Sequence, residues 1–204
     1  MRKISMLSVV VFLLLAVPSF AQGYAKLEIF GGYNLVSISS HNDYGERIRT
    51  NMNGYNAAFT FNPTSVLGIK AEFAGVYNST KLPEWSFYEG EVDVKHKLNF
   101  FSFMAGPQIN VRVDGPVTPF GHFLVGVGKY SEKAEYDGSS FDIKDTYYPV
   151  AMGGGVDVSV RRNLAFRGQI DYFPWLRPDS GSIYKNIRIT IGVVFRIKRN
   201  DPYL

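Results

Sequence analysis

The sequence contains no cysteine, which excludes disulfide bonds and thiolate metal sites in the folded protein. After its N-terminal region it has no apolar run of the roughly 20 residues that a membrane-spanning helix needs. It also shows no helical periodicity of apolar residues. The formal net charge of +4 over 204 residues is too small to indicate a nucleic-acid partner. The chain is therefore expected to be neither a disulfide-rich domain, nor a helical membrane protein, nor a nucleic-acid-binding protein.

The first residues have the pattern of a secretory signal peptide. Two basic residues precede an apolar stretch of 12 residues, and small residues follow it up to Ala21. A stretch of this length is too short for the alternative, a retained anchor helix. We expect cleavage between Ala21 and Gln22, which separates a signal peptide (residues 1–21) from a single mature domain (residues 22–204).

Apolar residues alternate with small or polar residues along the mature chain, and this period of two is typical of β-strands. The pattern is clearest near the C-terminus, where Ile187, Ile189 and Ile191 alternate with Arg188 and Thr190. The expected fold class is therefore all-β. The segments with this pattern are residues 25–35, 55–61, 67–77, 101–112, 120–128, 150–160, 164–172 and 187–197.

The connections between these segments alternate between short and long. Alternating short turns and long loops are typical of an eight-stranded antiparallel up-and-down transmembrane β-barrel, in which the short turns face the periplasm. The short connections contain residues 62–65, 114–116 and 161–163, and the long, polar connections are residues 38–53, 78–98, 130–146 and 174–185.

Alternation alone fits a soluble barrel equally well, because that barrel turns its apolar face inward. Two features favour the membrane barrel. The polar face combines charged residues with glycines, which suits a narrow interior. The apolar face carries aromatic residues near both ends, as lipid-facing barrels do. These are Tyr33, Tyr55, Tyr77, Phe101, Tyr148 and Tyr172 near the long connections, and Phe61, Phe166 and Phe195 near the short turns. We also expect an irregularity at Pro107, which lacks a backbone donor in mid-strand.

The charged residues of the polar face predict a salt-bridge network inside the barrel. An eight-stranded barrel is only just wide enough for side chains to fill, and buried charges must be paired. We expect the network to plug the lumen and stabilise the fold; the alternative is a narrow channel for small solutes. The residues are Lys26, Glu28, Lys70, Glu72, Asp157, Arg167, Asp171, Arg188 and Arg196.

The C-terminal segment resembles the sorting signal of outer-membrane barrels, with Thr190, Gly192, Phe195 and Ile197 at the characteristic positions. Together with the sequence Glu28-Ile29-Phe30-Gly31-Gly32-Tyr33 and the alternating strands, it makes the mature chain similar to the OmpA-like outer-membrane β-barrel domain superfamily. The resemblance implies a Gram-negative outer-membrane protein that serves envelope integrity, adhesion or host interaction. It also implies recognition by the barrel-assembly machinery. Ile197 is not aromatic and residues follow it, which departs from the usual signal.

A lipid A-modifying enzyme is a further alternative, but the chain has only three histidines. His41 and His96 fall in long connections, and His122 points inward without a serine two residues away. A hydrolase needs a nucleophile, a base and an orienting acid within hydrogen-bond reach. We therefore predict no catalytic, cofactor-binding or metal-binding residues.

The long connections are expected to determine the specific role of the protein. Aromatic residues in 78–98 (Trp85, Phe87, Tyr88) and in 174–185 (Phe173, Pro174, Trp175 and Leu176 nearby) predict a surface for a ligand or, alternatively, a lid. We expect a structural or surface-interaction protein of the bacterial outer membrane. Its expected partners are membrane lipid, lipopolysaccharide and the barrel-assembly machinery.

Overall fold

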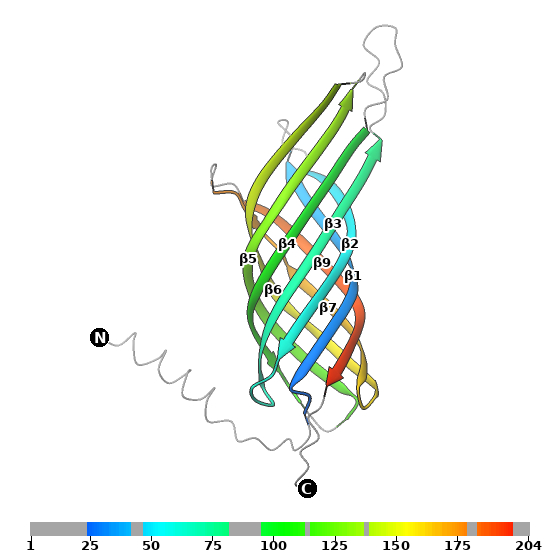
Figure 1. Ribbon diagram of the computed structural model, residues 1–204, viewed down its shortest axis with the longest axis vertical. Coiled ribbons are helices and arrows are strands. Elements are labelled where there is room, and N and C mark those ends of the chain that lie inside the picture. The colour runs from blue at the N-terminus through cyan, green and yellow to red at the C-terminus, as the bar shows by residue number, and fades with distance from the viewer. Residues whose placement is uncertain are drawn as a thin grey trace, which may run out of the picture.

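The computed structural model describes residues 24–41, 47–81, 95–112, 115–136, 139–178 and 183–197. These residues form one antiparallel sheet closed into a barrel (Figure 1). The described part of the chain contains no helix long and apolar enough to cross a membrane. The strands are β1 (Leu27–His41), β2 (Arg47–Phe61), β3 (Leu67–Lys81), β4 (Lys95–Asn110), β5 (Val117–Tyr136), β6 (Ser139–Arg161), β7 (Leu164–Tyr172), β8 (Trp175–Leu176) and β9 (Ile183–Ile197).

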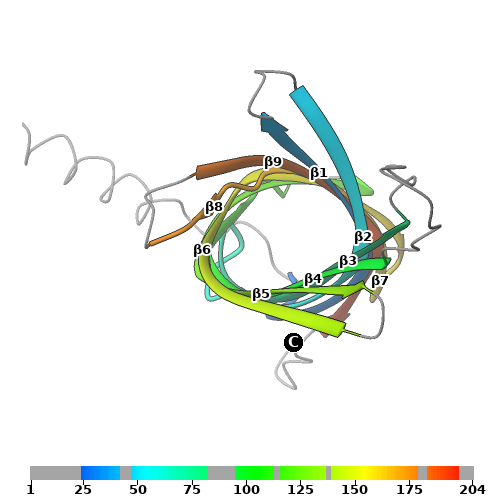
Figure 2. The ribbon, with the colours of Figure 1, turned by 90° about the horizontal axis from the view of Figure 1, so that it is seen from above.

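The barrel closes where β1 pairs with β9, from Leu27 opposite Ile197 to Ser39 opposite Lys185. The strands form a continuous ring when seen along the axis (Figure 2). The short β8 pairs with β6 and β9, which are also the neighbours of β7. β7 and β8 are therefore one strand, and the eight-stranded up-and-down barrel predicted from the sequence is confirmed.

The three short turns lie at one end of the barrel, where β1 also begins and β9 ends (Figure 1). Gly115 in the β4–β5 turn has a φ of 142°, a conformation that residues with a side chain rarely adopt. The β6–β7 turn contains only Arg162 and Asn163. The predicted short turns are confirmed; in transmembrane barrels such turns face the periplasm.

At the opposite end, part of each predicted long loop is in fact strand. β5 and β6 have 20 and 23 residues, although roughly 9–11 tilted residues cross a membrane. They stay paired up to Tyr136 and Ser139, so irregular structure over residues 130–146 was a wrong prediction. Residues 38–53 and 78–98 also contain segments of β1 to β4, whereas residues 174–185 contain only the short β8 and the first residues of β9. Beyond the membrane both faces of a hairpin contact water, so alternation no longer marks the strands.

The apolar face of the sheet points outward. The predicted girdle residues at both rims are all among the exposed large apolar side chains, with exposed fractions from 41% for Tyr172 to 56% for Phe166. The charged residues Lys70, Glu72 and Arg188 are fully buried in the lumen. This polarity is the reverse of a soluble barrel, so the membrane barrel is the correct alternative.

Two prolines alter the ladder without opening the wall. At Pro107 the β4–β5 pairing lacks the pairs of Gly106 and Pro107, but the register is the same on both sides of the gap. The expected irregularity is therefore a gap and not a bulge. Pro174 separates β7 from β8, yet its carbonyl still accepts a hydrogen bond from the backbone N–H of Val150 at 3.0 Å. This bond keeps the seventh strand attached to β6.

Candidate functional site

The lumen is filled by inward side chains from every strand, and it is the candidate functional site. Three groups of residues follow one another along it. The short-turn cluster consists of Glu28, Arg112, Asp157, Arg167 and Arg196. The mid-lumen cluster consists of Lys70, Glu72, His122, Asp171 and Arg188. The aromatic cluster contains Phe100, Tyr147, Phe173 and Trp175.

Arg167 is the centre of the short-turn cluster. Its Nε and Nη2 donate to the two carboxylate oxygens of Asp157 at 2.7 and 2.9 Å, a bidentate arrangement. Its Nη2 also donates to Glu28 at 3.2 Å. The guanidinium carbon lies 4.3 Å from the ring centroid of Phe120, where a cation is attracted to the aromatic face. Asp157 and Arg167 are partners in the β6–β7 register, so the sheet itself brings them together.

Two further arginines complete this cluster. Arg196 donates from Nη2 to Asp157 at 2.7 Å and from Nη1 to the hydroxyl of Ser159 at 2.7 Å. Arg112 donates to Glu28 at 3.1 Å and to the backbone carbonyl of Ser65 at 2.8 Å. Arg112 thereby joins the lumen to the β2–β3 turn. Arg112 was not among the residues predicted for the network.

The mid-lumen cluster contains the most deeply buried charges. Arg188 donates from Nη1 to Glu72 at 2.6 Å and from Nη2 to Asp171 at 2.7 Å. Lys70 lies 2.9 Å from the other oxygen of Glu72, and all four side chains are fully buried. His122 Nε2 lies 3.0 Å from Asp171, also with no exposed side-chain area. Charges buried to this degree are tolerated only when each has an opposite partner, and the structure provides one for each.

Lys26 does not belong to these clusters, and its predicted place in the network was wrong. It precedes the first residue of β1 and lies in a bend, where its side chain is exposed. The backbone N–H of Asn62 donates to its carbonyl at 2.8 Å. The inward–outward alternation applies only within the ladder, and Lys26 lies outside it.

The aromatic cluster was not predicted. Phe100 and Trp175 stack with ring centroids 3.9 Å apart, and the rings of Tyr147 and Phe173 meet Phe100 edge-on. Trp175 is only 3% exposed and Phe173 only 1%, so their expected exposure in a surface loop was wrong. Phe173 and Trp175 occupy the odd-numbered positions that face the lumen, as Arg167 and Asp171 do in β7. Extending that alternation past Pro174 in the sequence would have identified them.

The aromatic and mid-lumen clusters are in direct contact. The guanidinium carbon of Arg188 lies 4.6 Å from the ring centroid of Phe173. The aromatic side is sealed further by Val36, Met52 and Leu124, each at most 1% exposed. An ion entering from the outer rim would pass the partly exposed ion pair of Asp145 and Arg177 and would then meet an apolar layer before it reached the mid-lumen cluster.

The remaining candidates are the residues considered for catalysis, metal binding and a surface ligand. His122 is buried in the lumen, with 6% of the residue exposed. The residues that the structure describes include no group of three or more histidine, aspartate and glutamate side chains suited to a metal ion. Trp85, Phe87 and Tyr88 lie outside the described residues.

The residues of the predicted sorting signal lie on both faces of β9. Phe195 and Ile197 are exposed on the outer face, and Thr190 is buried in the lumen, where its hydroxyl donates to Asn34 at 2.7 Å. A Cβ atom at Gly192 would clash with the backbone of Gly31 and Gly32 on the neighbouring strand and would come within 2.7 Å of the ring of Phe30. The packing of Phe30 in the lumen is thus one structural reason for a glycine at this position.

Replacing Arg188 by leucine should lower the free energy of unfolding by about 3–5 kcal/mol, because Glu72 and Asp171 lose a buried partner. Arg112→Leu is the matched control, since the Arg112 side chain is 14% exposed and pairs at the edge of the lumen. Its effect should be clearly smaller. Guanidinium unfolding of the refolded protein in lipid vesicles measures both. Equal losses in the two variants would contradict the importance of the buried pairs.

Known proteins show the same architecture. The solved structures of Ail from Yersinia pestis (TM-score 0.60, 18% identity, 87% of this chain and 100% of that chain) and Neisserial surface protein A (0.60, 13%, 86% and 100%) are similar to it. So is OprG from Pseudomonas aeruginosa (0.57, 13%, 87% and 98%). No curated protein sequence is significantly similar. The family model of the outer membrane protein beta-barrel domain matches residues 7–196, and the chain therefore belongs to this family of the bacterial outer membrane.

Proposed function

We propose that this outer-membrane protein is a closed barrel that does not conduct solutes and that acts through the parts it exposes at the cell surface. The observation that carries the proposal is the filled lumen. Two charged clusters and an aromatic cluster occupy it in succession, and Arg188, Phe100 and Trp175 are at most 3% exposed. A structural and surface-interaction role then remains for the outward parts of the chain.

The energetics of the charged clusters argue against the alternative of a narrow channel. A passing ion would have to displace Arg167 from Asp157 or Arg188 from Glu72, and each of these ion pairs is buried. Separating a buried pair leaves charges without a partner at a cost of several kcal/mol. Conduction requires sites that an ion can both enter and leave.

The protein in planar bilayers should therefore show no stable conductance of nanosiemens size. The variant Phe100→Ala/Trp175→Ala should remain closed, because the charged clusters still fill the lumen below the removed rings. An open porin in the same bilayer is the positive control. Stable conductance of the wild-type barrel would overturn the closed-lumen proposal, and conductance of the double variant alone would show that the aromatic cluster is the seal.

Exposed lysines at the outer end of the apolar band support contact with lipopolysaccharide. Lys129 and Lys144 are exposed on the adjacent strands β5 and β6. Lys129 follows Val127 and Lys144 precedes Tyr148, and Val127 and Tyr148 are the last apolar residues of the lipid-facing surface on these two strands. Lysine at this level meets the phosphate groups of lipid headgroups. The similar protein Ail was solved with the heparin analogue sucrose octasulfate, which is also anionic.

Lys129→Glu/Lys144→Glu should weaken the binding of purified lipopolysaccharide to the reconstituted barrel, by about 1 kcal/mol for each lysine. The loss should shrink at high salt because the interaction is screened. Lys26→Glu is the matched control, since Lys26 is exposed near the short turns. If Lys26→Glu weakens binding as much as Lys129→Glu or Lys144→Glu alone, the effect is one of net charge and the proposed contact is wrong.

A surface ligand is proposed for residues 78–98, which include the aromatic residues Trp85, Phe87 and Tyr88. The described parts of this region extend the hairpin of β3 and β4 beyond the girdle residues Tyr77 and Phe101. Residues 174–185 contribute less than expected, because Trp175 is buried.

Exchanging residues 82–94 for a glycine–serine segment of equal length should abolish attachment of expressing cells to host cells or matrix. Heat-modifiable migration on a gel should be unchanged, because the barrel below is intact. The same exchange of residues 42–46 is the control and should have little effect. Attachment that survives the first exchange would contradict the role of this hairpin.

Export and insertion belong to the same proposal. Cleavage between Ala21 and Gln22 would release the mature domain, residues 22–204, into the periplasm. The outward Phe195 and Ile197 on the last strand would then be available to the barrel-assembly machinery. The mass of the protein extracted from outer membranes tests the cleavage site.

A further inference from the structure

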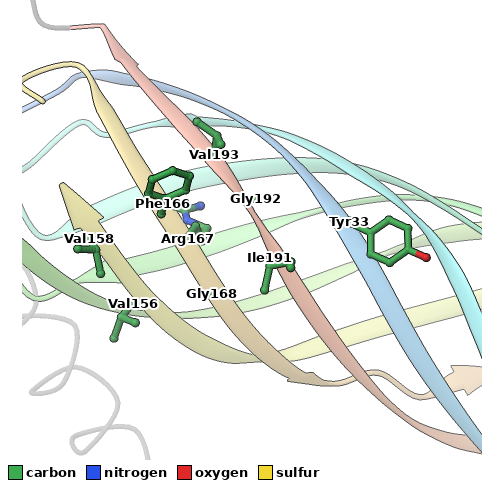
Figure 3. Close-up of a pocket in the computed structure, with 9 residues that line it drawn as sticks. All are labelled: Tyr33, Val156, Val158, Phe166, Arg167, Gly168, Ile191, Gly192 and Val193. Carbon is green, nitrogen blue, oxygen red and sulfur yellow. The ribbon is translucent and has the colours of Figure 1, made fainter. Parts of the chain in front are cut away.

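The outer wall of the barrel has a hollow of about 480 Å³ that the closed lumen does not explain. Figure 3 shows it on the lipid-facing side of β6, β7, β9 and β1, with the side chains of Val156, Phe166 and Ile191 around the bare backbone at Gly168. The side chains of Phe166 and Ile191 project outward from the barrel wall, since these residues are 56% and 62% exposed. The remaining lining residues are Tyr33, Val158, Arg167, Gly192 and Val193.

The hollow exists because Gly168 has no side chain. In the sheet register Gly168 lies between Val156 of β6 and Ile191 of β9, both of which point outward. A glycine in a strand weakens it and usually marks a bulge, a bend or a close approach of another group. The register shift of β6 and β7 lies elsewhere, between Ser159 and Arg161.

Nothing in the described part of the chain requires the glycine. A Cβ atom at Gly168 would meet no atom within 4 Å, and the residue does not have a positive φ. Gly32 and Gly192 differ, because there an added Cβ would collide with the ring of Phe30. The space above Gly168 is therefore left open toward the outside. Gly31, opposite Val193 in the register, is open in the same way.

The surroundings determine what can occupy this space. The hollow lies in the apolar band between the girdle residues Phe166 and Tyr172 of β7, where the neighbouring medium is hydrocarbon. Its walls are valine, isoleucine, phenylalanine and tyrosine side chains. Arg167 only lines the floor, because its charged group is bound to Asp157 and Glu28 inside the lumen. An occupant therefore has to be apolar.

We propose that the hollow is a binding site for one acyl chain of a membrane phospholipid. It is continuous with the lipid-facing surface that membership of the family establishes, and it is open along that surface. The site rests on the embedding of the barrel in the membrane and is independent of the closed lumen. A conductance result that contradicts the closed-lumen proposal would therefore leave the proposed acyl-chain site unaffected.

The test uses the mature protein in bilayers of phosphatidylethanolamine and phosphatidylglycerol that contain a trace of phospholipid with a photoreactive acyl chain. After irradiation, peptide mapping should show labelling concentrated on residues 189–196 and around Val156. In Gly168→Phe this labelling should fall by about half or more, because the ring fills the space. Gly121→Phe is the matched control, since Gly121 lies in β5 outside the hollow and an added Cβ there makes only an ordinary contact at 3.6 Å.

Several results would overturn the proposal. Labelling spread evenly over all strands, or unchanged in Gly168→Phe, would show ordinary lipid contact without a site. Labelling only by lipopolysaccharide with a photoreactive chain would show that the assigned source is wrong. The chain has no cysteine, so Gly168→Cys introduces a unique thiol, and a disulfide-linked dimer trapped in membranes would assign the hollow to a second copy. If Gly168→Phe does not insert, Gly168→Val fills part of the same space and should lower the labelling less.

Discussion

The pairing of β1 with β9 is the interaction on which the rest of the structure depends. In hydrocarbon an unpaired backbone N–H or C=O costs several kcal/mol, so a sheet can cross the membrane only when its two edges are joined. Thirteen residues of β1, from Leu27 to Ser39, take part in this closure. Closure then sets the polarity, because one face of every strand must contact lipid and the other must fit a space that eight strands leave only just wide enough for side chains.

This narrow interior explains how four buried carboxylates are tolerated. Asp157 faces Arg167 and Asp171 faces Arg188 across neighbouring strands, so the register that closes the barrel also positions the partners. Glu28 and Glu72 reach arginines from other strands, Arg167 and Arg188, and tie together parts of the wall that are not adjacent. Removing any one partner would leave a charge in a site that water does not reach, which is why the clusters act as units.

Much of the barrel could be predicted from the sequence, because within the membrane a side chain has only two possible surroundings. Alternation therefore identified the strands, their outward aromatics and the inward positions of residues such as Glu72 and Arg188. Alternation gave wrong predictions outside the membrane-spanning part of the strands, where side chains are not restricted to these two surroundings. Lys26 continues the pattern but precedes the first paired residue, and the hairpin of β5 and β6 extends into water, where both faces accept polar residues. The burial of Trp175 was not predicted because a proline usually ends a strand, whereas here the carbonyl of Pro174 accepts a hydrogen bond from the backbone N–H of Val150.

The glycines of the barrel wall fall into two groups. Some are required by the packing inside the lumen, and others leave open space on the lipid-facing side. Inside the lumen, the missing side chains at Gly32 and Gly192 make room for the ring of Phe30, which in turn lies 5.4 Å from the guanidinium carbon of Arg167. These glycines are part of the packing that closes the interior. On the lipid side, the missing side chain at Gly168 makes room for nothing in the protein. A filled interior leaves the outer surfaces as the places where this barrel meets other molecules, and the hollow at Gly168 belongs to those surfaces.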